Sequence, residues 1–216
     1  MNKVPVSMVV ILVLAIGLGG MFQPVQSVFA QGPSGTTFGE LSEVEIESML
    51  LMREEEKLAR DVYAELYEAY GAQIFLNIFA SESTHFDQMG VLLERYELED
   101  PVLEPGVFTN HHLQDLYDML IPMGLSSLKN AYRVGAIIEE VDILDYLHFL
   151  EDQDVDNKDI RQVYTSLMNA SENHLRGFVS NLLSIGVVYE PDYLSQELYD
   201  AILAEETGGV GNTAGH

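Results

Sequence analysis

The sequence predicts an all-α protein, and three observations lead to this fold class. Four long stretches carry apolar residues at alternating spacings of three and four, which is the pattern of an amphipathic helix. No stretch alternates apolar and polar residues over a useful length, and no Asn-Gly or Asp-Gly pair marks a hairpin. Apolar residues make up 47% of the 216 positions, enough for one domain with its own core.

The first two predicted helices follow each other closely in the chain. A capping box of Ser42 and Glu45 opens the first, which runs to about Tyr70 and ends at Gly71. The second is expected over residues 72–96, with a stripe of isoleucine, phenylalanine, methionine and leucine along one face. These two helices form the first pair.

A longer connection separates this pair from the next. Two prolines and a glycine interrupt the helical pattern soon after residue 98. Thr109 is expected to cap a short helix over about 110–120, which Pro122 and Gly124 then end. The crossover should therefore contain one short helix.

The second pair of long helices resembles the first in length. Ser126 or Ser127 opens a helix that is expected to reach Glu151, and an acidic turn leads to a fourth helix over 158–185. After Pro191 a short C-terminal helix should reach about residue 204. Two pairs joined by one long crossover are the connectivity of a ferritin-like four-helix bundle, here expected over residues 41–204.

Both ends of the chain are expected to lie outside this domain. Residues 1–30 have the features of a secretory signal, with Lys3 before an apolar run and Ala30 at the cleavage position. The run is shorter than the roughly 20 residues of a membrane-spanning helix, so cleavage and export are expected rather than retention as an anchor. Residues 31–40 should be a flexible leader and residues 205–216 a disordered tail.

Composition excludes several classes of function. The formal charge is −25, or −26 once Lys3 is removed, and so acidic a surface repels nucleic acid and anionic lipid while it attracts cations. No stable membrane insertion is expected after signal cleavage. The chain has no cysteine, which excludes disulfides, thiolate metal sites, iron–sulfur clusters and cysteine nucleophiles.

A Glu-x-x-His pair, Glu82 and His85, lies in the middle of the second predicted helix. Residues three apart share one helix face, and inward Glu-x-x-His pairs bind metal in di-iron and di-manganese bundles. Glu56 and Glu140 each replace an apolar residue in the stripe of their helix. A buried carboxylate needs a cation, so the alternatives are a metal ion, an arginine partner (Arg53, Arg60 or Arg133), or a rotated helix that faces water.

The fourth helix adds His174, which shares a stripe with apolar residues. Taken alone, it fits a hydrogen-bonded core histidine equally well. Taken together, each long helix places a carboxylate or imidazole near its midpoint, and midpoints of antiparallel helices meet at one level. Carboxylates and imidazoles are ligands for iron, manganese or zinc.

Four stretches occur in a recognisable order: REEEKLARDVY at 53–63, SESTH at 81–85, VGAIIEEVDI at 134–143 and NHLRGF at 173–178. Together they resemble the signatures of the DUF2202 family, a ferritin-like group near the rubrerythrin-like proteins. The resemblance implies the ferritin-like fold and a dinuclear metal centre. Its ligands by position would be Glu56, Glu82, His85, Glu139 or Glu140, and His174.

The chain departs from this pattern at one position. A second complete Glu-x-x-His would place glutamate three residues before His174, where the chain has Ser171. Asp142, Glu139 or Glu172 would have to supply the missing carboxylate, or one of the two metal positions would be weak.

The resulting expectation is an exported, metal-binding oxidoreductase that acts on O₂, peroxide or ferrous iron, with two iron ions, or manganese or zinc in their place. No catalytic residue is assigned; Tyr63 is expected to fill the core rather than relay electrons. An electron donor would have to be external, since no cysteine-based rubredoxin module is present. A homo-oligomer is compatible with this reading. The alternatives are a non-catalytic metal-binding or storage protein and a structural helical module with a degenerate site.

Overall fold

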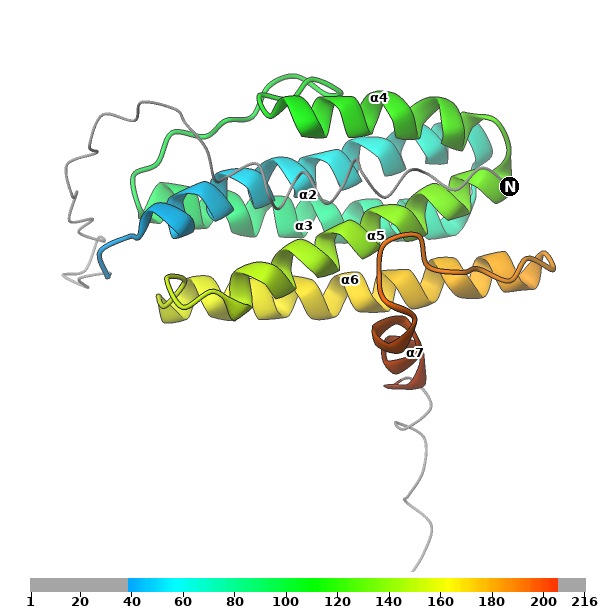
Figure 1. Ribbon diagram of the computed structural model, residues 1–216. Coiled ribbons are helices and arrows are strands. Elements are labelled where there is room, and N and C mark those ends of the chain that lie inside the picture. Colours follow the sequence, from blue (N-terminus) through cyan, green and yellow to red (C-terminus); the bar gives the residue numbers. More distant parts are fainter. Residues whose placement is uncertain (1–38, 206–216) are drawn as a thin grey trace, which may run out of the picture.

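The computed structural model describes residues 39–205, which form helices and no strand, so the all-α prediction is confirmed for this part of the chain (Figure 1). The signal, the leader up to residue 38 and the tail from residue 206 lie outside the described residues. The helices are α2 (Glu43–Tyr70), α3 (Gln73–Arg95), α4 (His111–Leu125), α5 (Leu128–Glu151), α6 (Lys158–Ser184) and α7 (Gln196–Glu205).

Local signals define several helix ends as predicted. The Ser42 hydroxyl accepts from the Glu45 amide at 3.0 Å, and the Glu45 carboxylate accepts from the Ser42 amide at 3.1 Å, which completes the capping box. Gly71 ends α2 at a φ of 61°, in the left-handed region that glycine tolerates without strain. Ser127, rather than Ser126, caps α5 through the Asn130 amide.

The prediction for the crossover helix was wrong at both ends. Asn110 caps α4, because its side chain accepts from two amides of the first turn, whereas the Thr109 amide donates to the Glu54 carboxylate. The helix then continues through Pro122 to Leu125. Proline there removes one hydrogen bond in the last turn, and the close packing of Gly124 against Leu66 of α2 holds that turn in place.

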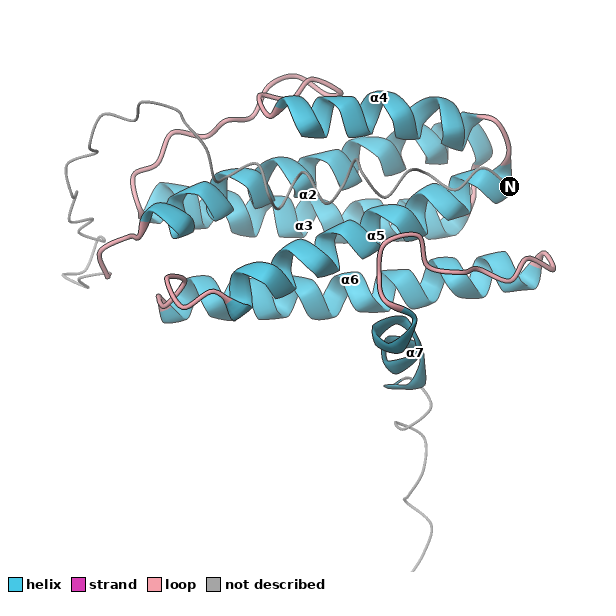
Figure 2. Ribbon diagram, viewed as in Figure 1, coloured by secondary structure: helices cyan, strands magenta, loops and turns pink. Residues whose placement is uncertain are grey.

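The helices pack as two pairs, α2 with α3 and α5 with α6, and the pairs face each other (Figure 1). Helix α4 lies over α2 and α5, while α7 lies outside α6 at the end of a loop (Figure 2). Helices α5 and α6 approach closely at Gly135, where an added Cβ would lie 2.4 Å from the Phe178 ring. Within residues 39–205, no helix combines the length and the apolar character that a membrane crossing needs.

Apolar side chains gather in two clusters, one toward each end of the long helices. One cluster includes Leu58 and Val62 of α2, and the other includes Met49 and Met52 of the same helix. Residues 53–57 therefore lie between the clusters, and the corresponding middle turns of α3, α5 and α6 do so as well. The core thus contains a polar layer at half height, and this layer holds the candidate site.

Candidate metal centre

Five acidic and imidazole side chains converge in the polar layer, and all five are among the residues singled out from the sequence. They come from four different helices. They are Glu56 of α2, Glu82 and His85 of α3, Glu139 of α5, and His174 of α6.

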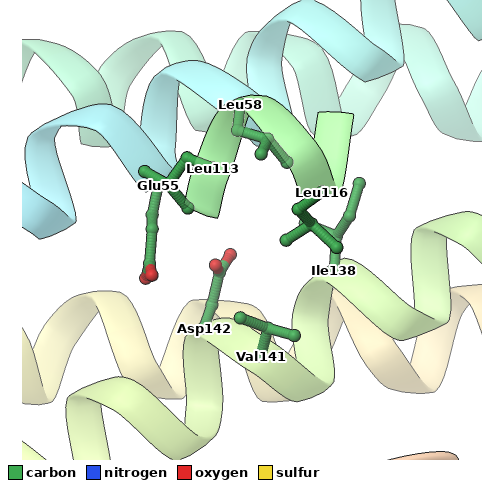
Figure 3. Close-up of a pocket in the computed structure, with 7 residues that line it drawn as sticks. All are labelled: Glu55, Leu58, Leu113, Leu116, Ile138, Val141 and Asp142. Carbon is green, nitrogen blue, oxygen red and sulfur yellow. The ribbon is translucent and has the colours of Figure 1, made fainter. Parts of the chain in front are cut away.

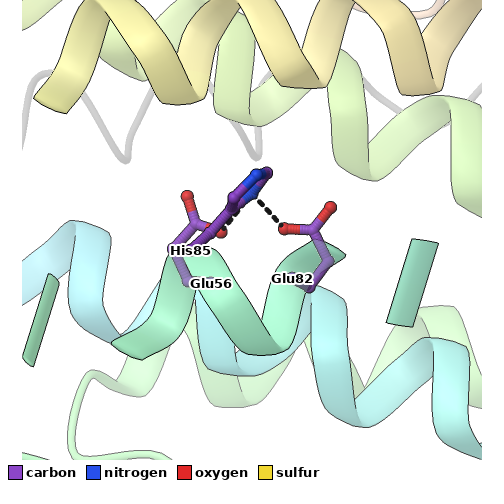
Figure 4. Close-up of side chains that lie close together, drawn as sticks. All are labelled: Glu56, Glu82 and His85. Carbon is purple, nitrogen blue, oxygen red and sulfur yellow. Dashed lines mark hydrogen bonds and ion pairs between the residues drawn. The ribbon is translucent and has the colours of Figure 1, made fainter. Parts of the chain in front are cut away.

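The first set of donors comprises Glu56, Glu82 and His85, whose ligand atoms all lie within 4.8 Å of one another (Figure 4). The His85 Nδ1 atom is 2.9 Å from Glu82 Oε2 and 3.4 Å from Glu56 Oε2. Glu82 and His85 meet because they are three residues apart on one face of α3. All three side chains are buried, and the Glu82 residue has no exposed surface.

The second set comprises Glu82, Glu139 and His174, again within 4.8 Å of one another. The His174 Nδ1 atom is 2.8 Å from Glu82 Oε1 and 3.4 Å from Glu139 Oε2. Glu82 therefore belongs to both sets, with one carboxylate oxygen directed to each imidazole. This is the arrangement expected of a carboxylate that bridges two ions.

Several carboxylate oxygens and one ring nitrogen of the cluster are fully buried but have no hydrogen-bond partner. Glu82 Oε1 and His174 Nδ1 are close together but lack the alignment that a hydrogen bond requires, and each remains unpartnered. The same holds for Glu56 Oε2 and Glu139 Oε2. Buried polar atoms are normally satisfied, so their convergence without partners fits a bound cation.

The arginines considered as alternative partners are committed elsewhere. Arg53 pairs with Asp100 at 2.7 Å, and Arg60 pairs with Asp61 at 2.9 Å. Arg133 pairs with Asp192 at 2.9 Å, near the C-terminal loop. Within residues 39–205, none of these guanidinium groups forms an ion pair with the cluster, so the two imidazoles are the basic groups that balance its three carboxylates.

The electrostatics of the cluster follow from this balance. Burial opposes the charged form of both rings, but ion pairs with the surrounding glutamates outweigh it and raise the pKa of His85 and of His174 to about 10. Burial likewise acts to raise the pKa of Glu82, yet the two imidazoles lower it to about 2. Burial, followed by repulsion from Glu82, raises the pKa of Glu56 to about 8. Protons on the rings thus supply the positive charge that a metal ion would otherwise supply.

Ser81 links the two imidazoles on their outer side. Its hydroxyl lies 3.2 Å from His85 Nε2 and 3.1 Å from His174 Nε2. One hydroxyl oxygen has two lone pairs and can accept from both rings. In that arrangement Nε2 carries the proton of each neutral ring and Nδ1 is free to bind a metal ion.

Two buried tyrosines support the outer glutamates in a crossed pattern. Tyr63 of α2 donates to Glu139 Oε1 of α5 at 2.5 Å, and Tyr146 of α5 donates to Glu56 Oε1 of α2. Each tyrosine follows the glutamate of its own helix by seven residues, which is two turns along the same face. Because the tyrosines bond the outer oxygens, the other oxygen of each glutamate faces the imidazoles.

Glu140 does not join the cluster. Its carboxylate accepts from the Tyr189 hydroxyl at 2.6 Å and from the backbone amides of Asp192, Tyr193 and Leu194 at 2.6 to 3.2 Å. Neighbouring residues on a helix point about 100° apart, so only one of Glu139 and Glu140 can face the layer between the helices. Glu140 instead anchors the loop between α6 and α7.

Three residues could supply the carboxylate that Ser171 does not provide, and they lie in different places: Glu139, Asp142 and Glu172. Glu172 lies near Arg176, at 3.8 Å, away from the cluster. Asp142 is buried, and this burial is the main cause that raises its pKa. Repulsion from the nearby charges of Glu56, Glu139 and Glu82 raises the pKa further. Ser171 is buried and directs its hydroxyl to the Leu167 carbonyl of its own helix at 3.2 Å. Only Glu139 among the candidates belongs to a donor set.

Sequence reasoning did not identify Ser81 or Tyr146 as parts of the site. A signal for Tyr146 was present, because Glu139 and Tyr146 repeat the seven-residue spacing of Glu56 and Tyr63. No comparable signal marks Ser81, since a serine four residues before a histidine is common on helices. Its role depends on the position of α6 relative to α3.

The donor set suits a particular class of ion. Three carboxylates and two imidazoles, with no sulfur ligand, favour iron, manganese or zinc over ions that prefer thiolates. Two overlapping sets with a shared glutamate fit a dinuclear centre, and the orphaned buried oxygens point into it. The residues present therefore fit a pair of divalent ions.

The chain is similar in sequence and in structure to an uncharacterized family of proteins. The sequence pattern of the family described as "Uncharacterized protein domain (DUF2202)" matches residues 45–206. The chain is 46% identical over 169 residues to the uncharacterized protein MJ0754 of Methanocaldococcus jannaschii, which spans 77% of this chain and 90% of the relative. A crystal structure of hypothetical protein MJ0754 from Methanococcus jannaschii superposes with a TM-score of 0.75 at 44% identity, over 79% of this chain and 98% of that one.

Proposed function

The chain belongs to the DUF2202 family, and we propose that it is a ferritin-like metalloprotein that holds two iron ions between its four long helices. The observation that carries the proposal is the pair of donor sets that share Glu82. Ferritin-like di-iron and di-manganese proteins take one glutamate from each of two helices and Glu-x-x-His pairs from the other two. Here α2 and α5 provide single glutamates, and α3 provides a complete pair.

Within this proposal, each residue has a definite part. Glu56 and His85 would hold one ion, Glu139 and His174 would hold the other, and Glu82 would be the ligand that both share. Iron in such a ligand set supplies one-electron redox chemistry toward O₂, peroxide or ferrous iron as substrate. We propose an oxidoreductase of this type, with manganese or zinc as alternative ions.

The remaining residues orient the ligands and exclude water. Tyr63 and Tyr146 hold Glu139 and Glu56 by their outer oxygens, so these carboxylates enter the site already positioned. Ser81 would hold the remaining proton of each metal-bound imidazole on Nε2. The apolar clusters on either side of the layer would keep water from it. Electrons for turnover would come from an external donor, since no side chain in this cysteine-free chain can supply them repeatedly.

A metal analysis followed by a reaction test examines the proposal. Protein purified without chelator should contain about two metal ions per chain, as a dinuclear carboxylate site requires. Anaerobic loading with ferrous iron and exposure to O₂ or H₂O₂ should then give a near-ultraviolet absorption band and repeated turnover. The matched pair of variants is Glu82→Gln, which removes the shared ligand, and Glu172→Gln, which removes a carboxylate outside the cluster. Equal metal content in the two variants would refute the site.

Ser171 favours a second candidate function. With one carboxylate fewer than two complete Glu-x-x-His pairs would supply, the site could bind ions without redox turnover and act in storage or in stabilising the helices. Stoichiometric binding that raises the melting temperature, without oxidation of added ferrous iron, would support this function over the first.

We also propose export of the domain, on the basis of the first 30 residues of the sequence. The acidic composition suits a secreted protein that attracts metal cations. N-terminal sequencing of the protein recovered from its native host should show a chain that begins near residue 31, and retention of the first residues would contradict export by cleavage.

A further inference from the structure

Among the five donors of the candidate centre, the two histidines are the ones that solvent reaches. The three glutamates, Glu56, Glu82 and Glu139, are at most 1% exposed. The side chain of His85 is 7% exposed, and that of His174 is 12% exposed. An ion that approaches from this side therefore meets an imidazole before it meets a carboxylate.

Ser81 lies beside both rings, in the seam between α3 and α6. The serine is half-buried, and its hydroxyl is 3.2 Å from His85 Nε2 and 3.1 Å from His174 Nε2. The two rings are nearly parallel, with 21° between their planes. Because Ser81 and His85 belong to α3 and His174 belongs to α6, the hydroxyl joins the two helices across the seam.

Further along α6, an apolar contact closes the same seam. A Cβ added to Gly177 of α6 would lie 3.4 Å from the side chain of Ile74 of α3, which is ordinary packing distance. That contact does not depend on hydrogen bonds. At Ser81, in contrast, the seam depends on polar contacts of a half-buried hydroxyl, which water can replace at little net cost.

Within residues 39–205, buried side chains close the other approaches to the polar layer. Tyr63 and Tyr146, which support the outer glutamates, have no exposed surface. The two apolar clusters close the layer toward the two ends of the long helices.

The side that faces α4 contains a cavity, but this cavity does not lead outward. It has a volume of about 10 Å³ and is lined by Glu55, Asp142 and five aliphatic side chains of α2, α4 and α5 (Figure 3). All seven lining residues are at most 5% exposed. The volume is close to what one water molecule requires, so the cavity is an internal space rather than a route for ions.

We propose that Ser81 is the latch of an entry route between α3 and α6, through which metal ions reach and leave the buried carboxylates. This inference rests on the proposed function, because it concerns the ions that the two donor sets would hold. Rotation of the Ser81 side chain away from the rings breaks both hydrogen bonds and frees the His174 ring, the more exposed of the two, to turn outward. Ser81 is thus a positioning residue that acts through the imidazoles.

Stopped-flow loading of the metal-free protein with Co²⁺ tests the latch, since bound cobalt has a visible spectrum. At one pH, Ser81→Ala should speed both the entry of Co²⁺ and its release to a chelator by about tenfold, because lost hydrogen bonds make opening easier. Ser81→Thr keeps the hydroxyl and should restore both rates. Ser83→Ala is the matched control, because the Ser83 hydroxyl bonds the Phe79 carbonyl of its own helix, and both rates should stay unchanged.

The pattern of rates separates a latch from a residue that only supports the rings. If the hydroxyl did no more than fix the Nε2 protons, Ser81→Ala would speed release alone. Equal entry rates for the wild type and Ser81→Ala would overturn the proposal, because ions would then enter elsewhere. Absence of bound Co²⁺ in every one of these proteins would instead refute the proposed function.

A second measurement needs no metal ion. Nuclear magnetic resonance of isotope-labelled histidine follows the exchange of ring N–H protons with solvent, and this exchange reports opening of the seam. The Nε2 protons of His85 and His174 should exchange about tenfold faster in Ser81→Ala than in the wild type. Ser83→Ala should match the wild type. Equal exchange in Ser81→Ala and the wild type would overturn the latch whether or not the centre binds metal.

Discussion

The helical pair α2–α3 and the pair α5–α6 provide the two halves of the candidate centre with matching residues, except at one position. Glu56 and Tyr63 of α2 correspond to Glu139 and Tyr146 of α5, at the same seven-residue spacing. Each tyrosine supports the glutamate of the opposite pair. His85 and His174 face each other with ring centroids 5.6 Å apart.

The difference lies three residues before each histidine. Helix α3 has Glu82 there, whereas α6 has Ser171, whose hydroxyl bonds its own helix. As a result, one carboxylate has to serve both halves, and Glu82 directs one oxygen to each imidazole. If the proposed metal site is correct, this difference predicts that metal binding depends on Glu82 far more than on Glu56 or Glu139.

The largest effect is expected for Glu82→Gln. Loss of the shared carboxylate should weaken binding of both ions by more than about 100-fold, beyond what loss of a supporting residue costs. Equilibrium dialysis against Co²⁺, with its visible spectrum as a second signal, measures both ions. If one ion remains bound with unchanged affinity, the two halves are independent and the comparison fails.

The pH dependence of metal binding should be steep, and the half that contains Glu56 should release one more proton near neutrality. Because the pKa of His85 and of His174 is raised to about 10, both rings are protonated at neutral pH, and a metal ion must displace those protons. The pKa of Glu56 is raised to about 8, so its carboxyl gives up a third proton near neutrality. Affinity should therefore rise with pH by about 1000-fold per unit near neutrality if all three protons leave, rise more slowly above pH 8, and level off near pH 10.

Calorimetric titration in two buffers with different ionisation heats counts the protons released. Equal numbers for the first and second ion would show that the Glu56 carboxyl does not release a proton on binding. No release at all would contradict the protonated rings described here.

Glu140→Gln should lower the stability of the protein without changing its metal content, because Glu140 lies outside both donor sets. The position that corresponds to Glu140 on α2 is Lys57, so this glutamate is not one of the matching residues. Because four donors lose a charged acceptor, we expect the protein to lose about 2 kcal/mol in its free energy of unfolding. Urea denaturation measures this loss, and metal content should stay unchanged; a lost ion would place Glu140 in the site.

The smallest effect is expected for Ser171→Glu, which would make the two halves alike. A carboxylate at this position should strengthen binding of the weaker ion by about tenfold, since it adds a charged ligand beside His174. Ser171→Gln has nearly the same size without the charge and controls for changes in packing. Equal affinities for the two variants would show that a carboxylate from α6 does not reach the ion.

Features of the site that depend on a single helix could be predicted from the sequence, whereas features that depend on several helices could not. The pairing of Glu82 with His85 follows from their spacing on a single helix, and sequence analysis found it. The choice between Glu139 and Glu140 depends on how α5 is rotated against its neighbours, and the pattern of apolar residues left it open. Ser81 could not be found at all, because its environment is made by helices distant in the chain.

The sequence by itself determined the all-α class, the capping of α2 and α5, and the inward position of most donors, because these depend on local hydrogen bonds and on the helical period. Only the tertiary structure decided that α4 continues past Pro122, that Glu140 anchors a loop, and that Glu82 faces two imidazoles at once. These features depend on packing between helices, where burial removes competing water and makes the partner of each polar group decisive.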